Sequence, residues 1–344
     1  MEEGPNPEYE IGALLSKSGF PCVAPLAGSI EYRNPAGDAI TLAVLNGYVR
    51  GGIEGWQYTL DHLGMYFENA LARGPGGPSS DTSDGIGNEL TSSYLETARL
   101  LGARTGDLHA ALAAHPEDPV FAPEPFTDFY RHGLYHGMIG RLSRTMDQVR
   151  SNIQKLPEAV RPDAQAVLNR EEALRNRYRF FRDQRLDAMR IRIHGDYHLG
   201  QVLYTGKDFV IIDFEGDPSR PLSERRIKRS PLQDVASMID SFYHASHGVM
   251  FGEAPGVIPN PESADALEKW ARYWARAVAS AFLDAYLATP GVAALLPENP
   301  DHVRMMIRLY LADFALHKLS FELAHAPERI RVPAHLIVDL LEAT

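Results

Sequence analysis

The feature that most constrains the fold is a change of hydrophobic period in the middle of the chain. From about residue 91 onward, apolar residues recur mainly at the 3.6-residue spacing of helices, but over residues 190–217 they follow a period of two. A chain of 344 residues with helical sequence on both sides of a short β segment predicts an α+β fold, built as one large domain or two lobes.

The rest of the chain divides at its breaks in periodicity. A helix is predicted at residues 8–18, with Pro7 at its opening. Runs at residues 29–33 and 39–49 flank the turn 34–38 and predict a β-hairpin. Further helices are predicted at residues 56–72, 92–114, 125–153, 163–189, 232–248, 264–287 and 302–325. The Gly/Pro-rich stretch 74–80 has no strand before it and no Gly-Lys-Ser/Thr after it, which predicts a surface loop instead of a phosphate-binding loop.

Composition excludes several classes of function. The formal net charge is −11, which argues against non-specific binding to nucleic acid or to acidic membranes, since both favour a basic surface. The single cysteine, Cys22, excludes an internal disulfide and a cysteine-cluster metal site, and we expect it to be buried. No apolar run approaches the ~20 residues that span a bilayer, and the first residues lack a signal-peptide pattern. We therefore expect a cytoplasmic protein.

The β segment brings polar side chains together. Residues 202–204 and 209–212 read as two short strands of a hairpin, preceded by a polar loop that carries Asp196. Gln201 opens the first strand and Asp213 follows the second, so antiparallel pairing places both at one end of the ribbon. Carboxylate and amide oxygens of this kind suit Mg²⁺, which binds through few protein groups plus substrate phosphates.

The spacing matches the phosphotransferase pattern H-x-D-x-x-x-x-N followed by D-F-x. Asp196 stands at the base position, and Gln201 replaces the Asn. The second motif is Asp213-Phe214-Glu215, with Glu in place of Gly. In that chemistry a carboxylate takes the proton of the acceptor hydroxyl, while metal ions neutralise the transferring phosphoryl group. His194 is interpreted as structural, whereas His198 is left open between substrate contact and loop stabilisation.

The motifs resemble those of bacterial maltokinases, including the kinase domains fused to trehalose synthases. The similar stretches are residues 6–12, 25–28, 56–61, 194–203, 212–222 and 230–236. This resemblance implies an α+β fold of the protein kinase-like, aminoglycoside phosphotransferase-like type. It also implies an N-lobe remnant with the hinge at residues 1–55 and a mostly helical C-lobe at residues 56–344.

The implied reaction transfers the γ-phosphate of ATP, with Mg²⁺, to the anomeric hydroxyl of maltose, in trehalose and glycogen metabolism. The implied partners are a small sugar substrate and, in some members, trehalose synthase. The resemblance makes Asp196 the base and Asp234 the anchor of the catalytic loop. It places Gln201 and Asp213 on the metal and the nucleotide, with Glu215 as an auxiliary metal residue. The hinge residues implied to face adenine are Leu45, Asn46, Tyr48 and Val49.

Two departures from the maltokinase pattern modify these expectations. Lys17 is the only lysine before residue 100 and falls on a predicted helix, so the strand with the ATP lysine is not recognised, and we expect a truncated kinase of poor activity. Glu10 is the candidate acidic partner for such a lysine. In residues 313–327, Phe314, His317 and Ala326 replace the Lys, Tyr and Arg of the family, which predicts weaker disaccharide binding.

These departures leave two alternatives open. One is a related kinase for glucosamine or an aminoglycoside. The other is a catalytically weak pseudokinase module associated with trehalose synthase. Trp270, Tyr273 and Trp274 share a helix face, where core packing is favoured over sugar stacking.

Overall fold

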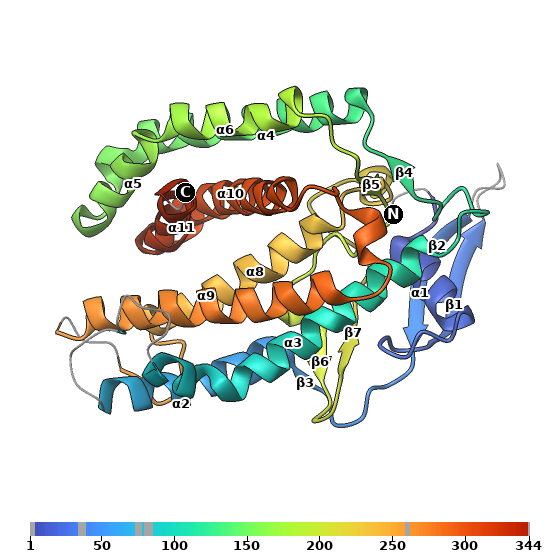
Figure 1. The fold of residues 1–344 in the computed structure, drawn as a ribbon, viewed down its shortest axis with the longest axis horizontal. Coiled ribbons are helices and arrows are strands. Elements are labelled where there is room, and N and C mark those ends of the chain that lie inside the picture. The colour runs from blue at the N-terminus through green and yellow to red at the C-terminus, as the bar shows by residue number, and fades with distance from the viewer. Residues whose placement is uncertain (1–3, 34–38, 73–77, 79–84, 259–261, 343–344) are drawn as a thin grey trace. The chain divides into compact units, whose positions relative to one another are not determined.

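The computed structural model describes residues 4–33, 39–72, 78, 85–258 and 262–342 (Figure 1). The predicted turn 34–38, and all of the predicted loop 74–80 except Pro78, lie outside these residues. The chain forms two compact units, one of Met1–Glu124 with Arg190–Leu295 and one of Pro125–Met189 with Leu296–Thr344. Two short strands, β4 (Glu124–Pro125) and β5 (Met189–Arg190), lie where the chain passes between the units. The predicted lobe boundary near residue 55 stays a prediction.

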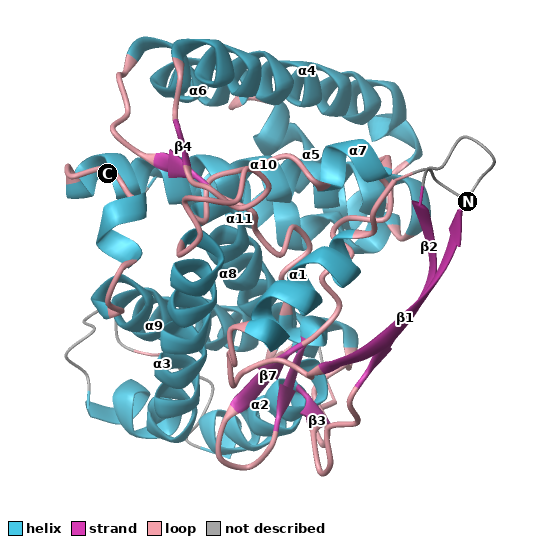
Figure 2. Ribbon diagram, turned by 90° about the vertical axis from the view of Figure 1, so that its right-hand side faces the viewer, coloured by secondary structure: helices cyan, strands magenta, loops and turns pink. Residues whose placement is uncertain are grey.

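The first unit opens with a helix and a long hairpin. Helix α1 (Pro7–Lys17) starts at Asn6, whose side chain accepts a hydrogen bond from the backbone N–H of Glu8. Strands β1 (Leu26–Arg33) and β2 (Ala39–Asn46) pair antiparallel, which confirms the predicted hairpin (Figure 2). The second strand ends at Asn46, earlier than predicted, and the N–H of Gly47 still bonds the carbonyl of Pro25 at 2.8 Å beyond that end.

This unit also contains a three-stranded antiparallel sheet, in the order β3 (Ile53–Glu54), β6 (Val202–Tyr204), β7 (Phe209–Ile211). The β6–β7 pair confirms the hairpin predicted from the period of two. At the start of the segment with a period of two, only the short strand β5 forms, and Ile191 continues it as a single bridge to Arg229.

The four long helices of this unit are α2 (Gly55–Ala72), α3 (Gly85–Ala113), α8 (Leu232–His247) and α9 (Ala264–Ala288), of which α2 and α3 pack against the sheet. The short helices are α7 (Leu222–Arg225), η3 (Leu199–Gln201), η4 (Gly248–Phe251) and η5 (Val292–Leu295). Helices α3 and α9 lie side by side along their length (Figure 1). Trp270 and Trp274 are buried in the core, as predicted, and burial also raises the pKa of Cys22 to about 11.

The second unit is helical. Its long helices are α4 (Asp128–Asn152), α5 (Arg161–Leu168), α6 (Glu171–Asp183), α10 (Pro300–His325) and α11 (Arg331–Glu342), joined by the short helices η1 (Ile153–Lys155), η2 (Glu158–Val160) and η6 (Pro327–Ile330). The single helix predicted at residues 163–189 is wrong. A tightened turn at Asn169 and Arg170 ends α5, two glutamates then begin α6, and the backbone is extended from Gln184.

Within the described residues, no helix combines the length and the apolar character needed to cross a membrane.

Candidate active site

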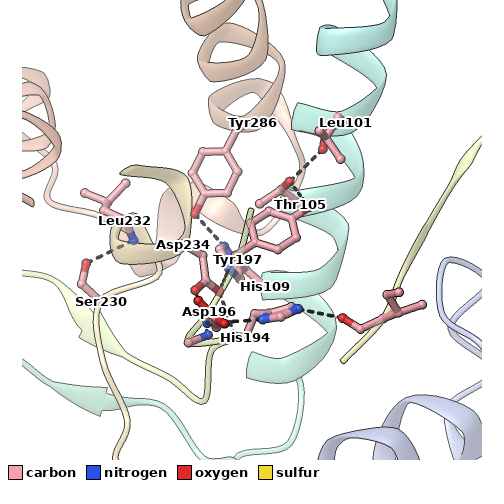
Figure 3. Close-up of polar contacts among 12 residues, drawn as sticks. Leu101, Thr105, His109, His194, Asp196, Tyr197, Ser230, Leu232, Asp234 and Tyr286 are labelled. Atoms are coloured by element: carbon pink, nitrogen blue, oxygen red, sulfur yellow. Dashed lines mark hydrogen bonds and ion pairs between the residues drawn. The ribbon is translucent and has the colours of Figure 1, made fainter. Parts of the chain in front are cut away.

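The loop that carries Asp196 is anchored by Asp234. Asp234 stands in the first turn of α8 and is 1% exposed. Its carboxylate accepts hydrogen bonds from the backbone N–H of His194 at 2.8 Å and of Gly195 at 3.0 Å (Figure 3). Gly195 has φ of +83°, a conformation that favours glycine. The predicted role of Asp234 in holding the loop is therefore confirmed.

His194 links the loop to the hairpin. Its Nε2 donates to the carbonyl of Ile212 at 2.9 Å, and its Nδ1 accepts from the N–H of Asp196 at 3.4 Å. The ring is buried, 1% exposed. These contacts agree with the structural role predicted for His194, because both ring nitrogens are used within the protein.

Asp196 itself is partly exposed, as a group that meets a substrate must be. The Nε2 atom of His198 lies 3.8 Å from its carboxylate. The Nδ1 atom of His198 accepts from the N–H of Gly200 at 3.0 Å, so the proton of a neutral ring sits on Nε2 and faces Asp196. His198 thus caps η3 and also stands beside the candidate base.

Gln201 and Asp213 meet at the end of the β6–β7 ribbon, as predicted. The side-chain amide of Gln201 donates to Oδ2 of Asp213 at 2.9 Å, and the N–H of Ile212 bonds the carbonyl of Gln201 at 3.0 Å. Asp213 has φ of +62° and is the one non-glycine residue in the left-handed region within the described part of the chain. Strained backbone of this kind clusters at functional sites.

The oxygens of Gln201 and Asp213 fit a divalent ion that takes its other ligands from a substrate. Both are hard donors, and Asp213 is exposed. No cluster of three His, Cys, Asp or Glu side chains able to hold a metal occurs among the described residues. Glu215 is exposed, and its carboxylate accepts a weak hydrogen bond of 3.5 Å from Asn6.

A cavity of about 450 Å³ opens beside the hairpin, within the range of sites for small ligands. Three of the predicted hinge residues, Asn46, Tyr48 and Val49, lie on its wall. Leu45 is not among the lining residues, and its side chain is 64% exposed. Further lining residues are Glu8, Gly12, Val23, Ala24, Gly47, Gly52, Leu203, Ile211, Ile212 and Phe214.

Glu8 is a residue of the cavity that sequence reasoning missed. It is 7% exposed, and one carboxylate oxygen accepts from the side-chain amide of Asn46 at 2.7 Å, while the other accepts from the backbone N–H of Phe214. Burial raises the pKa of Glu8, although both hydrogen bonds act in the opposite direction. Glu8 therefore ties the end of β2 to the residue that follows Asp213. The sequence signals for Glu8 are its place in the first turn of α1, after an Asn cap, and in the family-like stretch 6–12.

The prediction that Glu10 is the acidic partner of an ATP lysine is not supported by the structure. Its carboxylate is held by Arg192 at 3.0 Å and by Arg226 at 2.7 and 2.9 Å. Residues two apart on a helix face different directions, so Glu8 and Glu10 cannot both point into the cavity.

The stretch expected to bind the sugar lies on α10 of the second unit. Asp313 accepts a hydrogen bond from Nε of Arg141 at 2.9 Å, and the same guanidinium lies 3.4 Å from Nδ1 of His317. Phe314 is half-buried, His317 is exposed, and Ala326 caps the C-terminus of α10. The consequence of these replacements for sugar binding stays a prediction.

Comparisons with known proteins find glucosamine kinases among the relatives of this chain. A glucosamine kinase of Streptacidiphilus jiangxiensis is 27% identical over 341 residues, which cover 98% of this chain and 66% of the relative. A glucosamine kinase of Mycolicibacterium smegmatis is 46% identical over 54 residues, 15% of this chain and 13% of that protein. This chain thus spans slightly less than two thirds of the first relative. No protein-family model matches the chain.

Solved structures show the fold. A glucosamine kinase in complex with glucosamine, ADP and inorganic phosphate superposes with a TM-score of 0.75, at 22% identity, over 98% of this chain and 69% of that one. A second crystal form of glucosamine kinase gives the same TM-score and covers 70% of that chain. These relatives are glucosamine kinases, so the specific resemblance to maltokinases is not supported, whereas the predicted α+β, kinase-like fold is confirmed. The chain therefore has the kinase-like fold of the glucosamine kinase structures.

Proposed function

We propose that this protein is a sugar kinase that transfers the γ-phosphoryl group of ATP to a hydroxyl group of glucosamine. The observation that carries the proposal is the contact of Gln201 with Asp213 at the end of the β6–β7 hairpin, which also borders a cavity. The loop of Asp196 is joined to the same hairpin by the hydrogen bond from His194 to the carbonyl of Ile212. The spacing of these residues matches that of phosphotransferases.

Asp196 is the proposed general base. A sugar hydroxyl is a poor nucleophile, and a carboxylate within hydrogen-bond reach orients it and takes its proton. The side chain of Asp196 is partly exposed, while the backbone of its loop is held by hydrogen bonds to Asp234. A substrate can therefore reach the carboxylate of Asp196. The loop backbone does not need to rearrange when the substrate binds.

Gln201 and Asp213 are the proposed Mg²⁺ ligands, with Glu215 as an auxiliary group. A bound Mg²⁺ supplies positive charge that stabilises the phosphoryl group during transfer. Glu8, through the N–H of Phe214, helps to hold Asp213 in its left-handed conformation. The donor set of one amide and one carboxylate suits an ion whose remaining ligands come from phosphate and water.

The cavity is the proposed nucleotide site. Asn46, Tyr48 and Val49 on one side and Leu203 and Ile211 on the other would enclose the adenine ring between an apolar wall and the backbone of the hinge. Leu45 was predicted to take part, but it is not among the residues that line the cavity.

Glucosamine is favoured over maltose as the acceptor. The relative that aligns with 98% of this chain is named a glucosamine kinase. The replacements Phe314, His317 and Ala326 also depart from the maltokinase pattern. An aminoglycoside acceptor, and trehalose synthase as a partner, remain predictions from the sequence.

The test is a panel of acceptors with Mg·ATP: glucosamine, N-acetylglucosamine, glucose, maltose and an aminoglycoside. We expect kcat/KM for glucosamine to exceed that for each other acceptor by about tenfold or more, because sites built to hydrogen-bond a group reject analogues that lack it. A preference for maltose would contradict the acceptor assignment. Nucleotide binding without turnover of any acceptor would favour the pseudokinase alternative.

A further inference from the structure

We propose that Tyr286 and His109 are positioning residues, which fix the loop of Asp196 through a buried relay of hydrogen bonds that ends on Asp234. The relay connects helices α9, α3 and α8 in that order. Its effect on turnover rests on the proposed function of Asp196, whereas its effect on the loop backbone does not.

The three side chains form one continuous chain of contacts. The hydroxyl of Tyr286 lies 3.0 Å from Nδ1 of His109, and Nε2 of His109 lies 3.1 Å from Oδ2 of Asp234 (Figure 3). Tyr286 and His109 are 0% exposed and Asp234 is 1% exposed. Because water does not reach these groups, the protein itself decides their geometry.

Hydrogen-bond chemistry determines which atom donates and which accepts in each contact of the relay. Asp234 as a carboxylate only accepts hydrogen bonds, so Nε2 of His109 is the donor. In a neutral imidazole Nδ1 is then an acceptor, and the hydroxyl of Tyr286 donates to it. Burial raises the pKa of Tyr286, which keeps this hydroxyl protonated.

Close packing of α3 on α9 brings the two helices to the required distance. A Cβ atom placed on Gly102 would lie 2.1 Å from the carbonyl oxygen of Phe282, and one on Gly106 would lie 2.5 Å from the side chain of Thr289. Gly102, Gly106 and His109 follow one face of α3, as residues spaced by four and three do. Only glycine permits this approach, and His109 reaches Tyr286 as a result.

Asp234 connects the relay to the loop that carries the candidate base. Oδ2 of Asp234 accepts both from His109 and from the N–H of His194, and Oδ1 accepts from the N–H of Gly195. With Nε2 of His109 in place, the carboxylate cannot turn without losing a buried hydrogen bond. His194 and Gly195 directly precede Asp196, so the orientation of Asp234 determines the position of Asp196.

The experiment compares Tyr286→Phe with Tyr94→Phe. Tyr94 also has a buried hydroxyl, bonded to Thr59 at 2.6 Å, but it has no place in the relay. Two variants at His109 complete the set. His109→Gln keeps an amide that can donate to Asp234, and His109→Leu removes the donor. Hydrogen exchange of the amides of residues 194 and 195 is measured together with kcat and KM.

We expect Tyr286→Phe to accelerate exchange at residues 194 and 195 and to lower kcat about three- to tenfold with little change in KM for ATP, the loss associated with one buried hydrogen bond. His109→Leu should have a larger effect, and His109→Gln should restore most of it. Tyr94→Phe should leave loop exchange and kcat near those of the parent.

Equal loop exchange in Tyr286→Phe and Tyr94→Phe would overturn the relay. So would loop exchange in His109→Gln as fast as in His109→Leu. If His109→Leu does not fold, the comparison of Tyr286→Phe with Tyr94→Phe still tests the relay. Since the exchange readout needs no turnover, an inactive protein with the expected exchange pattern would support the relay while contradicting the proposed kinase activity.

Discussion

Asp213 combines three properties that seldom occur in one residue. It is exposed, it accepts a hydrogen bond from Gln201, and its backbone is left-handed. For a residue with a Cβ that conformation costs about 1–2 kcal/mol, so the surrounding contacts must hold it. The N–H of the next residue, Phe214, is bonded to the buried Glu8.

We predict that Asp213→Gly is more stable than Asp213→Ala by about 1 kcal/mol, because glycine adopts the left-handed conformation without steric cost. Both variants lose the contact to Gln201, which therefore cancels in the comparison. Urea unfolding without ligands measures the difference. Equal stability of the two variants would show that the backbone here is not strained. Both should lose phosphotransfer, since both lose the carboxylate.

The second prediction at this scale concerns Asp196. Asp196→Asn should lower kcat by about 10²–10⁴-fold, the contribution typical of general base catalysis. The affinity for Mg·ATP should stay within about threefold, because Gln201, Asp213 and the cavity are unchanged. Calorimetry with nucleotide and steady-state rates with glucosamine give the two quantities. Turnover equal to that of the parent would remove Asp196 from the base role.

At the scale of helices and strands, most elements follow from local pattern. The alternation of residues 202–204 and 209–212 is sufficient to predict the β6–β7 hairpin, and hairpin geometry is sufficient to place Gln201 beside Asp213. The break between α5 and α6 has no glycine or proline to mark it, so one continuous helix was predicted there. Helix α11 was also not predicted. Such boundaries depend on packing, which local periodicity does not contain.

The packing of α3 on α9 gives a prediction for stability. Gly102→Ala should lower the free energy of unfolding by about 1–3 kcal/mol or more, because its Cβ would lie 2.1 Å from the carbonyl oxygen of Phe282. Gly133→Ala, in an exposed part of α4 with no atom within 4 Å of the new Cβ, should instead raise it by up to about 1 kcal/mol. Chemical denaturation of both variants checks the opposite signs.

Helices α5 and α11 give a prediction for pH dependence. Burial raises the pKa of Asp163, but hydrogen bonds from His335 at 3.0 Å and Arg331 at 3.2 Å outweigh it, and the net pKa is lower than the ordinary 3.8. A lowered folded-state pKa stabilises the fold fully above the unfolded value, and this contribution is lost as pH falls through the folded value.

Asp163→Asn should therefore cost more stability at pH 6 than at pH 3. Unfolding of parent and variant at both values, in the same salt, measures this difference. A cost that is the same at both pH values would contradict the ionic role of Asp163.

At the scale of the whole molecule, the cavity links distant parts of the chain. Residues from α1, the end of β2 and the β6–β7 hairpin line one space, although they are up to about two hundred positions apart in sequence. No short stretch of the sequence contains all the residues that line the cavity. This separation along the chain explains why the hinge was predicted from a family resemblance, whereas the place of Glu8 in the cavity was found only in the structure.

Filling this cavity gives the last prediction. Ala24 lines it, and Ala24→Phe should abolish the thermal stabilisation by Mg·ATP, which for the parent reaches about 2.7 kcal/mol at a concentration of 100 Kd. Leu42→Ala, on an exposed side chain of β2 outside the lining, should keep the full stabilisation. Thermal unfolding with and without nucleotide measures both. A full nucleotide shift in Ala24→Phe would exclude this cavity as the site.

The sequence alone determined the α+β class, most helices, the hairpin and the identity of the residues at its end. These depend on periodicity and on spacing within about twenty residues, which local backbone geometry converts directly into position. The tertiary structure decided which helices approach closely, that Glu8 instead of Glu10 faces the cavity, and that Tyr286 and His109 reach Asp234. Those contacts join residues many positions apart, and only the packed core brings them within hydrogen-bond distance.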